Sequence, residues 1–436
     1  MTINMDAMIQ HGKQQNLSIS TAKSSLFGCQ SERFRKGFVS RKKTLNPLLQ
    51  SIVFKALRKS VAGKKSDPSI MYSSDELLKL AKGSHGNILF SPFGITAGLG
   101  MVCAGAKGKT KDEIKSVLHL SQKSETAHKA FRDVIIDFKN NDEHYELRTS
   151  NLVCLPDTLS VLPDYSAVLS DMYQSSVKGV NFADSNAAVQ EINRDVKSAT
   201  NSRITDLIPE GVLNDDTRMV LVNALYFKGL WSKEFKKSNT IKATFWVSPK
   251  QSVKVPMMRS SGYFNHGTCG DIGASVLSMN YKGGNLSMVI VLPSERDGLA
   301  KVEAKLAKTG FVSSLEKTMK NKLVDVVFPR FEIEETVHLK DHLWIMGARN
   351  LFDGKACDLS GITGDRRLSV SFFFHNAALK VDEEGGGGEA STCVESSLLR
   401  VHQTLSFRAD HPFIFYIRDD TSGFMLFAGR VTDPLS

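Results

Sequence analysis

The spacing of apolar residues changes along the chain, from a helical period in the first half to continuous runs in the second. Two segments repeat apolar residues every three or four positions, which predicts amphipathic helices. One contains Ile114, Val117 and Leu118, and the other contains Val189, Ile192, Val196 and Ala199. Apolar runs of strand length predict β-strands at residues 219–227, 288–292, 324–328, 405–409, 413–417 and 424–431.

Local residues also predict where two helices begin. Ser91 and Pro92 have the order of an N-cap residue followed by proline at the first helical position. Thr110 and Glu113 have the spacing of a capping box. Residues 88–106 carry no charge and approach the length of a membrane span. Because this stretch contains Pro92 and four glycines, we expect a buried strand that leads into a core helix instead.

The last two predicted strands are separated by residues 418–423, whose Asp, Ser and Gly residues predict a hairpin. No internal repeat or long linker interrupts the second part of the chain. We therefore expect one α+β domain over residues 67–436, preceded by an extension over residues 1–66.

The positive net charge is concentrated in the extension. Residues 1–66 contain thirteen Lys and Arg against two acidic residues, Asp6 and Glu32, which gives a balance of +11. The whole chain carries +10, so the balance over residues 67–436 is −1. The basic character of the sequence therefore says little about what the domain does.

The extension is rich in Ser, Lys and Arg, and we expect a solvated, disordered tail. The alternatives are a transit peptide, a nuclear signal or a nucleic-acid-binding arm, the last of which would bind in a salt-dependent way. Residues 1–30 lack the apolar core of a secretory signal peptide. We expect a cytoplasmic or nucleocytoplasmic protein, with organelle targeting or leaderless release as alternatives, and we do not expect nucleic acid or a membrane as partners.

Common catalytic and metal-binding motifs are absent from the sequence. It contains no G-x-S-x-G elbow, no H-E-x-x-H pair, no phosphate loop ending in Gly-Lys-Ser/Thr and no EF-hand spacing. The six cysteines include no C-x-x-C pair, so neither a zinc site nor a disulfide framework is expected. The absence of these motifs is weak evidence against catalysis, because catalytic residues can also be assembled from distant parts of a chain.

Several separated stretches together resemble the serpin family, in the order and spacing of that family, and they cover nearly all of residues 70–436. The stretches are residues 87–92 (NILFSP), 223–229 (NALYFKG) with Trp231, 328–331 (FPRF), His375 with 382–385 (DEEG), 407–417 (FRADHPFIFYI) and 427–431 (FAGRV). The resemblance implies a serpin fold, with about nine helices and three β-sheets, and an exposed reactive-centre loop between Glu384 and the strand near Asp410.

The resemblance also implies a protein that is not an enzyme and uses no metal and no cofactor, and it implies a mechanism. In an inhibitory member a serine protease cleaves the loop, and the cut loop inserts as a new central strand while the acyl-enzyme is carried along and distorted. The plant-type branch often carries Leu-Arg at the cleaved bond. Leu399, Arg400 and Val401 are therefore expected around that bond, with Arg400 as bait for a trypsin-like serine protease.

The loop has the alternation of a half-buried strand, which favours insertion. One alternate set holds two carboxylates, Glu389 and Glu395, and two serines. The other set is small or apolar and consists of Gly386, Gly388, Ala390, Thr392, Val394, Ser396 and Leu398.

The hinge at the start of the loop departs from the family pattern. It consists of Glu383, Glu384, Gly385, Gly386, Gly387 and Gly388. The family has Thr-Glu followed by alanines where this chain has the last three glycines. Each Gly in a strand costs about 0.5–1 kcal/mol relative to Ala, so we expect them to weaken insertion by roughly 1.5–3 kcal/mol. Because inhibition is a race between insertion and deacylation, a slow hinge favours release of the protease.

Two further positions differ from the family. Gly94 stands where the family commonly has a serine, beneath the opening strands. The usual loop length, counted from Gly385, ends on Leu399, whereas the Leu-Arg match places cleavage one residue later, after Arg400. Both differences favour a protein that inhibits poorly.

Other matched residues are expected to have structural roles. Arg330 and Glu383 stand where the family pairs a cation with the residue at the base of the loop. Trp231 is expected to pack under the top of the main sheet, as it does in the family. His375 is expected to be a hydrogen-bonded core residue and Asn223 a structural one.

Two functional hypotheses follow. The first, which we favour, is a non-inhibitory or weakly inhibitory serpin with a degenerate hinge, a binding or chaperone-like protein. The alternative is a working suicide inhibitor of a trypsin-like serine endopeptidase, with Arg400 as bait. In either case we expect a monomer whose partner, if it inhibits, is a serine protease.

Overall fold

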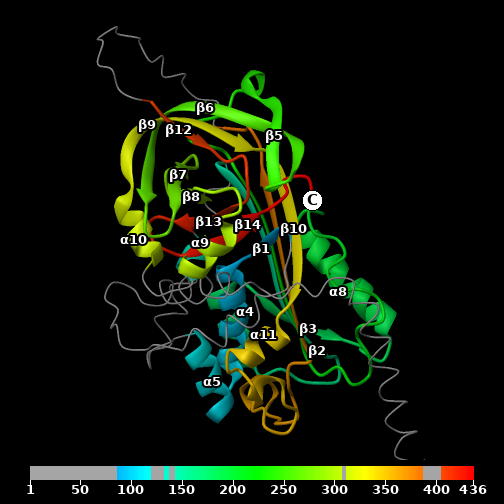
Figure 1. The fold of residues 1–436 in the computed structure, drawn as a ribbon. Coiled ribbons are helices and arrows are strands. Elements are labelled where there is room, and N and C mark those ends of the chain that lie inside the picture. The colour runs from blue at the N-terminus through cyan, green and yellow to red at the C-terminus, as the bar shows by residue number, and fades with distance from the viewer. Residues whose placement is uncertain (1–85, 119–131, 137–142, 307–310, 386–403) are drawn as a thin grey trace, which may run out of the picture.

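A computed structural model of the chain describes residues 86–118, 132–136, 143–306, 311–385 and 404–436 (Figure 1). The helices are α4 (Pro92–Gly105), α5 (Gly108–Leu118), α7 (Pro163–Tyr173), α8 (Ser185–Ala199), α9 (Leu299–Leu306), α10 (Phe311–Thr318), α11 (Lys340–Ile345) and α12 (Ser360–Thr363), with short 3₁₀ turns η1 (Lys237–Asn239) and η2 (Asn350–Phe352). The strands are β1 (Ile88–Phe90), β2 (Tyr145–Pro156), β3 (Ser176–Val180), β4 (Val220–Gly229), β5 (Ile241–Ser248), β6 (Gln251–Cys269), β7 (Ala274–Asn280), β8 (Leu286–Pro293), β9 (Lys320–Pro329), β10 (Phe331–His338), β11 (Phe372–Val381), β12 (Leu405–Arg408), β13 (Phe413–Asp419) and β14 (Met425–Val431). The predicted extension, residues 1–66, lies outside the described residues.

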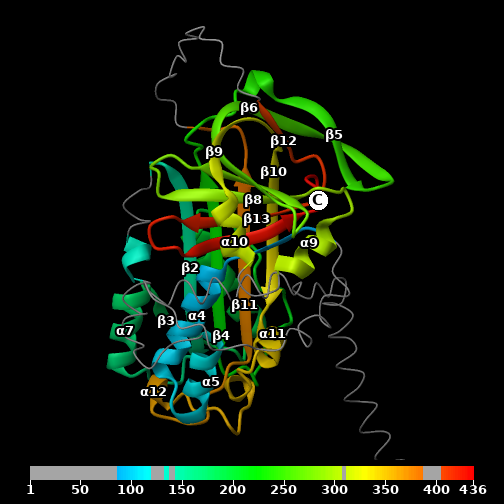
Figure 2. The same ribbon diagram turned by 60° about the vertical axis from the view of Figure 1, so that its left-hand side comes forward.

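A five-stranded sheet runs through the length of the molecule, in the order β10-β11-β4-β2-β3 (Figure 2). Two of its three inner strands, β4 and β11, are parallel neighbours, paired from Val220 opposite Phe372 to Lys228 opposite Lys380. The strands on either side, β2 and β10, are antiparallel to them. The centre of this sheet is therefore closed by direct pairing of β4 with β11.

Both faces of β4 are buried, and alternate residues face different helices. Leu221 and Leu225 belong to the core that contains α4, whereas Val222 and Tyr226 belong to the core that contains α8. The two helices lie on opposite faces of the sheet (Figures 1 and 2). Burial on both faces explains why β4 is a continuous apolar run in the sequence rather than an alternating one.

The remaining strands form a second network in the order β1-β14-β13-β8-β7-β6-β9-β12, with β5 paired to β6. The long strand β6 pairs with β5 over its first part, with β9 over its middle and with β7 over its last part. Hydrogen bonds through β6 thus join the two smaller expected sheets into one network of nine strands. The α+β organisation predicted from the sequence is confirmed.

The uncharged stretch at residues 88–106 is a strand followed by a helix, as predicted. Strand β1 ends before Ser91, whose hydroxyl accepts a hydrogen bond from the Gly94 amide (3.0 Å), and Pro92 opens α4. All but one residue of α4 is buried. Within the described residues, no helix is long and apolar enough to cross a membrane.

The predicted capping box is wrong. Helix α5 begins at Gly108, so Thr110 lies inside the helix rather than at its N-cap. The Thr110 hydroxyl accepts a hydrogen bond from the Asp358 amide (2.9 Å), and the Glu113 carboxylate accepts one from the Asn350 amide (2.7 Å). These side chains tie α5 to the segment around η2 instead of capping the helix. The apolar face that contains Ile114 is buried as predicted.

Candidate functional site

The last described residues before the loop extend the five-stranded sheet at one end. Gly385 forms a parallel bridge with Trp231, just beyond β4. The Trp231 amide donates to the Glu384 carbonyl (3.0 Å), and the Phe235 amide donates to the Glu383 carbonyl (3.2 Å). The base of the loop is therefore hydrogen-bonded to the chain that leaves β4.

The Trp231 side chain fixes this end of the sheet, and its exposed fraction is only 2%. It stacks on Tyr281 with ring centroids 4.5 Å apart and meets Phe235 edge-on at 6.0 Å. Its indole Nε1 donates to the Asp382 carbonyl (2.8 Å). This hydrogen bond satisfies the buried indole N–H.

Lys228, near the end of β4, binds two acidic residues of the hinge segment. Its Nζ lies 3.1 Å from Asp382 Oδ2 and donates to Glu384 Oε2 at 2.6 Å. Burial alone would lower the pKa of Lys228, but the hydrogen bonds to Glu384 and Asp382 raise it overall. This lysine therefore stays charged and holds the start of the hinge against β4.

Arg330 and Glu383 are brought together as the resemblance implies. The Arg330 Nη1 lies 3.7 Å from Glu383 Oε1. The Glu383 side chain is 5% exposed, whereas the Arg330 side chain is 50% exposed. A long, half-exposed pair of this kind contributes about 1 kcal/mol or less to stability.

Gly385 passes close to the chain at Glu234. A Cβ at this position would overlap the Cβ and Cα of Glu234. The segment after Trp231 and the hinge can therefore approach this closely only if residue 385 is glycine.

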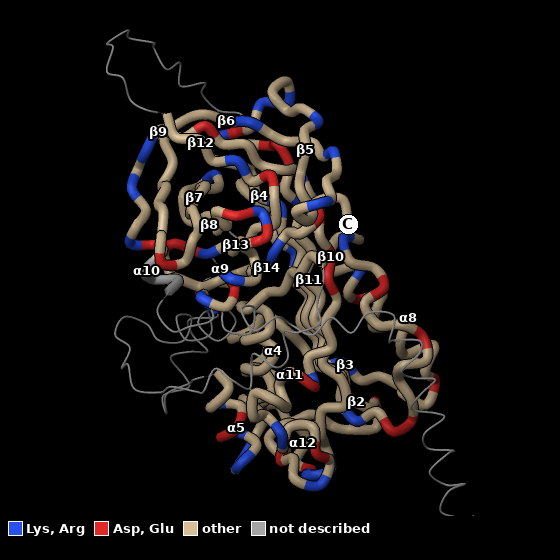
Figure 3. The backbone as a smooth tube through the Cα atoms, in the orientation of Figure 1, with Lys and Arg blue, Asp and Glu red and all other residues tan. Residues whose placement is uncertain are grey.

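A chain of polar side chains crosses the centre of the sheet. Asn223 on β4 donates through Nδ2 to the Asn151 Oδ1 on β2, and its Oδ1 lies 2.6 Å from the Nδ1 of His375 on β11. The Nε2 of His375 accepts from the Ser91 amide (2.9 Å) at the start of α4. Figure 3 shows that the strands crossing the middle of the molecule carry few charged residues. In the middle of the sheet, β4 and β11 are therefore linked by a hydrogen bond between two uncharged side chains, Asn223 and His375.

The partners of His375 fix its tautomer. The Ser91 amide can only donate, so Nε2 is the acceptor, and the proton lies on Nδ1, which donates to Asn223 Oδ1. Complete burial lowers the pKa of His375 to about 3. The ring is thus a neutral hydrogen-bonding link at any physiological pH.

Gly94 lies directly under this link. A Cβ on residue 94 would overlap Asn223 Oδ1 and Leu225 Cδ1. Asn223 cannot turn away freely, because His375 holds the same oxygen. In this chain the glycine at position 94 therefore makes room for the Asn223–His375 bond, and a serine hydroxyl has no space there.

Several predicted residues lie outside the described part of the chain. They are the hinge glycines Gly386, Gly387 and Gly388 and the expected cleavage residues Leu399, Arg400 and Val401. The described chain leaves the sheet at Gly385 and resumes at Thr404, one residue before β12.

Two contributors were not singled out from the sequence. Lys228 follows the apolar run of β4, so its charge indicated only the end of the strand and gave no sign that it binds the hinge. Asn151 lies in β2, where most residues are only partly buried, and no periodic pattern marked that strand. For Lys228 the signal was a charged side chain directly after a predicted buried strand, and for Asn151 the sequence offered no signal.

The described residues offer no metal site and show four free cysteines, Cys103, Cys154, Cys269 and Cys357. Burial raises the pKa of the Cys154 and Cys357 thiols to about 12, which leaves them unreactive.

Comparison with known proteins agrees with this geometry. The sequence model described as "Serpin (serine protease inhibitor)" matches residues 74–434. The chain is 38% identical to human Serpin B4 over 388 residues, which cover 85% of this chain and 99% of that protein. It is 37% identical to leukocyte elastase inhibitor A of Mus musculus, covering 80% of this chain and 93% of that one.

The crystal structure of Serpin48 from the insect Tenebrio molitor superposes with a TM-score of 0.73 at 31% identity, covering 90% of this chain and all of that one. These relatives are animal proteins. They therefore give no support to the plant-type resemblance suggested by Leu399 and Arg400.

Proposed function

The chain belongs to the serpin family, and on that premise we propose that it offers the segment after Gly385 as bait to a trypsin-like serine protease and traps that protease only weakly. The family is described as serine protease inhibitors rather than as enzymes. The observation that carries the proposal is a closed central sheet, in which β4 pairs directly with β11. In the sequence, three further glycines follow Gly385 at the start of the loop.

Because β4 and β11 are directly paired, the structure corresponds to an intact form in which the loop has not been inserted between them. Nine residue pairs join β4 and β11, from Val220–Phe372 to Lys228–Lys380, so no strand lies between them. An inserting loop would have to separate the two strands and break the Asn223–His375 bond. In exchange its backbone would gain hydrogen bonds on both sides.

Arg400 supports the choice of protease. It is the only Lys or Arg between Lys380 and Arg408. The specificity pocket of trypsin-like proteases carries an acidic group that binds a basic residue. One of the relatives is named for elastase, but that name describes the relative, and the basic residue favours a different target here.

The hinge supports weak trapping. Gly386, Gly387 and Gly388 would have to become the first residues of an inserted strand, which costs roughly 1.5–3 kcal/mol relative to alanine. If this cost reaches the insertion barrier, each 1.4 kcal/mol slows insertion about tenfold relative to deacylation.

Efficient inhibition is the second candidate. The alternation from Gly386 to Leu398 favours it, because small or apolar residues would face the core and Glu389 and Glu395 would face solvent. The inhibitor names of relatives point the same way.

The bait residue is tested by brief digestion with trypsin and mass spectrometry of the products. The proposal predicts early release of residues 401–436, and an Arg400→Ala variant should lose this product. Early cuts confined to residues 1–66, with Arg400 intact, would remove it as the bait.

A further inference from the structure

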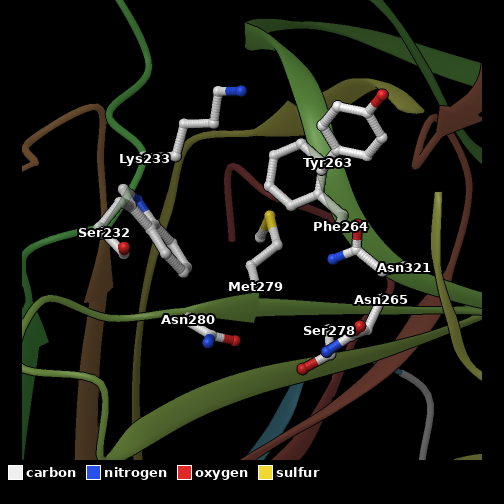
Figure 4. Close-up of a pocket in the computed structure, with 10 residues that line it drawn as sticks. Ser232, Lys233, Tyr263, Phe264, Asn265, Ser278, Met279, Asn280 and Asn321 are labelled. Atoms are coloured by element: carbon white, nitrogen blue, oxygen red, sulfur yellow. The ribbon is translucent and has the colours of Figure 1, made fainter. Parts of the chain in front are cut away.

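A polar cavity lies beside the base of the loop, between the segment after Trp231 and strands β6, β7 and β9 (Figure 4). Its volume is about 130 Å³. An engineered apolar cavity of about 150 Å³ binds benzene, so this space suits one small ring or a few waters. Neither the hinge mechanism nor the bait residue uses it.

Lys233 supplies the charge of this cavity. Its Nζ lies 5.6 Å from the centre of the Phe264 ring. It occupies the space left by the missing side chain of Gly262, where a Cβ would coincide with the ammonium. Within the described part of the chain, no carboxylate forms an ion pair with Lys233. Lys233 is exposed to solvent, and its ammonium lies near the Phe264 ring without an acidic partner among the described residues.

Neutral polar groups surround the remaining space. Asn265, Asn280 and Asn321 bring amides from three strands, or from the ends of strands, and Ser278 adds a hydroxyl that is almost fully buried. Figure 4 shows the Asn321 side chain and the Met279 sulfur directed toward the centre. These donors surround a single cation, and the described lining contains no acidic residue.

We propose that this cavity binds a small organic anion, a carboxylate, sulfate or phosphate carried on one flat ring. The anionic group would pair with Lys233 and accept from the asparagine amides. The ring would lie against the Phe264 side chain, near which Lys233 Nζ is placed.

The cavity and the hinge share one residue, Trp231. Trp231 lines the cavity, and its amide and indole donate to Glu384 and Asp382. The next residue, Ser232, donates its amide to the Asn280 carbonyl (3.0 Å). A ligand that bridges Lys233 and Asn280 therefore holds the segment that pairs with the base of the loop.

The test is isothermal titration calorimetry of the full chain with phenyl phosphate at low ionic strength. We expect saturable binding at millimolar concentration or below. Inorganic phosphate and phenol, which carry the anion alone and the ring alone, should each bind at least tenfold more weakly. The titration needs no protease, so its failure is separate from failure of the proposed inhibition.

Variants locate the site. Lys233→Ala should weaken binding tenfold or more, because a charge-assisted hydrogen bond is lost. Gly262→Val keeps the lysine but displaces its ammonium, and should weaken binding similarly. Lys250→Ala, at the β5–β6 turn outside the cavity, should leave it unchanged. Absence of saturable binding, equal affinity for inorganic phosphate, or equal affinity of the Lys233→Ala variant would overturn the proposal.

Discussion

Gly94 and His375 act together at the centre of the main sheet. The glycine leaves space for Asn223, and Asn223 Oδ1 accepts a hydrogen bond from the Nδ1–H of the neutral, buried His375 ring. The missing side chain of Gly94 and the hydrogen bond of His375 to Asn223 therefore determine how closely α4, β4 and β11 approach one another.

Replacing Gly94 by Ser should destabilise the protein by about 1–3 kcal/mol, because the new side chain forces Asn223 or Leu225 out of its place. Urea unfolding of both proteins measures the difference. Gly270→Ser is the matched control, since a side chain at Gly270 meets nothing within 4 Å. A Gly94→Ser variant as stable as the parent would show that the helix adjusts freely.

His375 should make stability depend on pH. Its pKa is about 3 in the folded chain, against an ordinary 6.5, so between these values the unfolded chain binds a proton that the folded chain does not. Stability from this residue is therefore present above pH 6.5 and falls as the pH drops toward 3, by at most about 1.4 kcal/mol per pH unit.

A His375→Gln variant should lose that component. The free energy of unfolding, measured in urea at pH 7, 6 and 5, should fall less steeply for the variant than for the parent protein. Other buried histidines, such as His338, contribute equally to both curves. Parallel curves would contradict the assignment of His375 as a buried neutral ring.

At the scale of elements, the end of β4 and the start of the hinge are held together by backbone contact that only a glycine permits. Gly385→Ala should separate the hinge from the segment that contains Glu234 and cost about 1–3 kcal/mol. Thermal unfolding of the intact protein checks this. Gly354→Ala, where the nearest atom would be 3.7 Å away, should be close to neutral. Equal melting of both variants would mean that the contact is not tight in solution.

The sequence predicted elements well where burial is uniform and poorly where it is not. Strands such as β4 and β14 are apolar throughout and were found with small errors at their ends. Strand β6 alternates between buried and exposed positions over nineteen residues and was not predicted. The capping box was wrong because Thr110 bonds to Asp358, a residue far along the chain. Contacts of this range leave no local pattern.

Long-range contacts also limited what the sequence could predict about the functional site. Motif matching named Trp231, Glu383 and His375, because their neighbours in sequence are distinctive. It did not show why residue 94 is glycine, since the reason is an approach between α4 and β4 across more than a hundred residues. It also gave no indication that Lys228 binds the hinge carboxylates.

For the whole molecule, we expect residues 1–66 to be dispensable for folding, because they contain too few apolar residues to offset the entropy of ordering. A chain that starts at residue 67 should melt within about 2–4 °C of the full chain, a shift that corresponds to roughly 1 kcal/mol. A melting temperature about ten degrees lower would show instead that the extension packs on the domain.

The balance between trapping and release also belongs to the whole molecule, because insertion of the loop must open the sheet from Gly385 down to His375. The most direct test is the fraction of covalent complex formed with trypsin, measured by denaturing electrophoresis for the natural chain and for a Gly386→Thr, Gly387→Glu, Gly388→Ala variant. We predict mostly cleaved chain and little complex for the natural protein, and at least tenfold more complex relative to cleaved chain for the variant. A natural chain that already traps trypsin efficiently, with no gain in the variant, would contradict the proposed role of the glycine hinge.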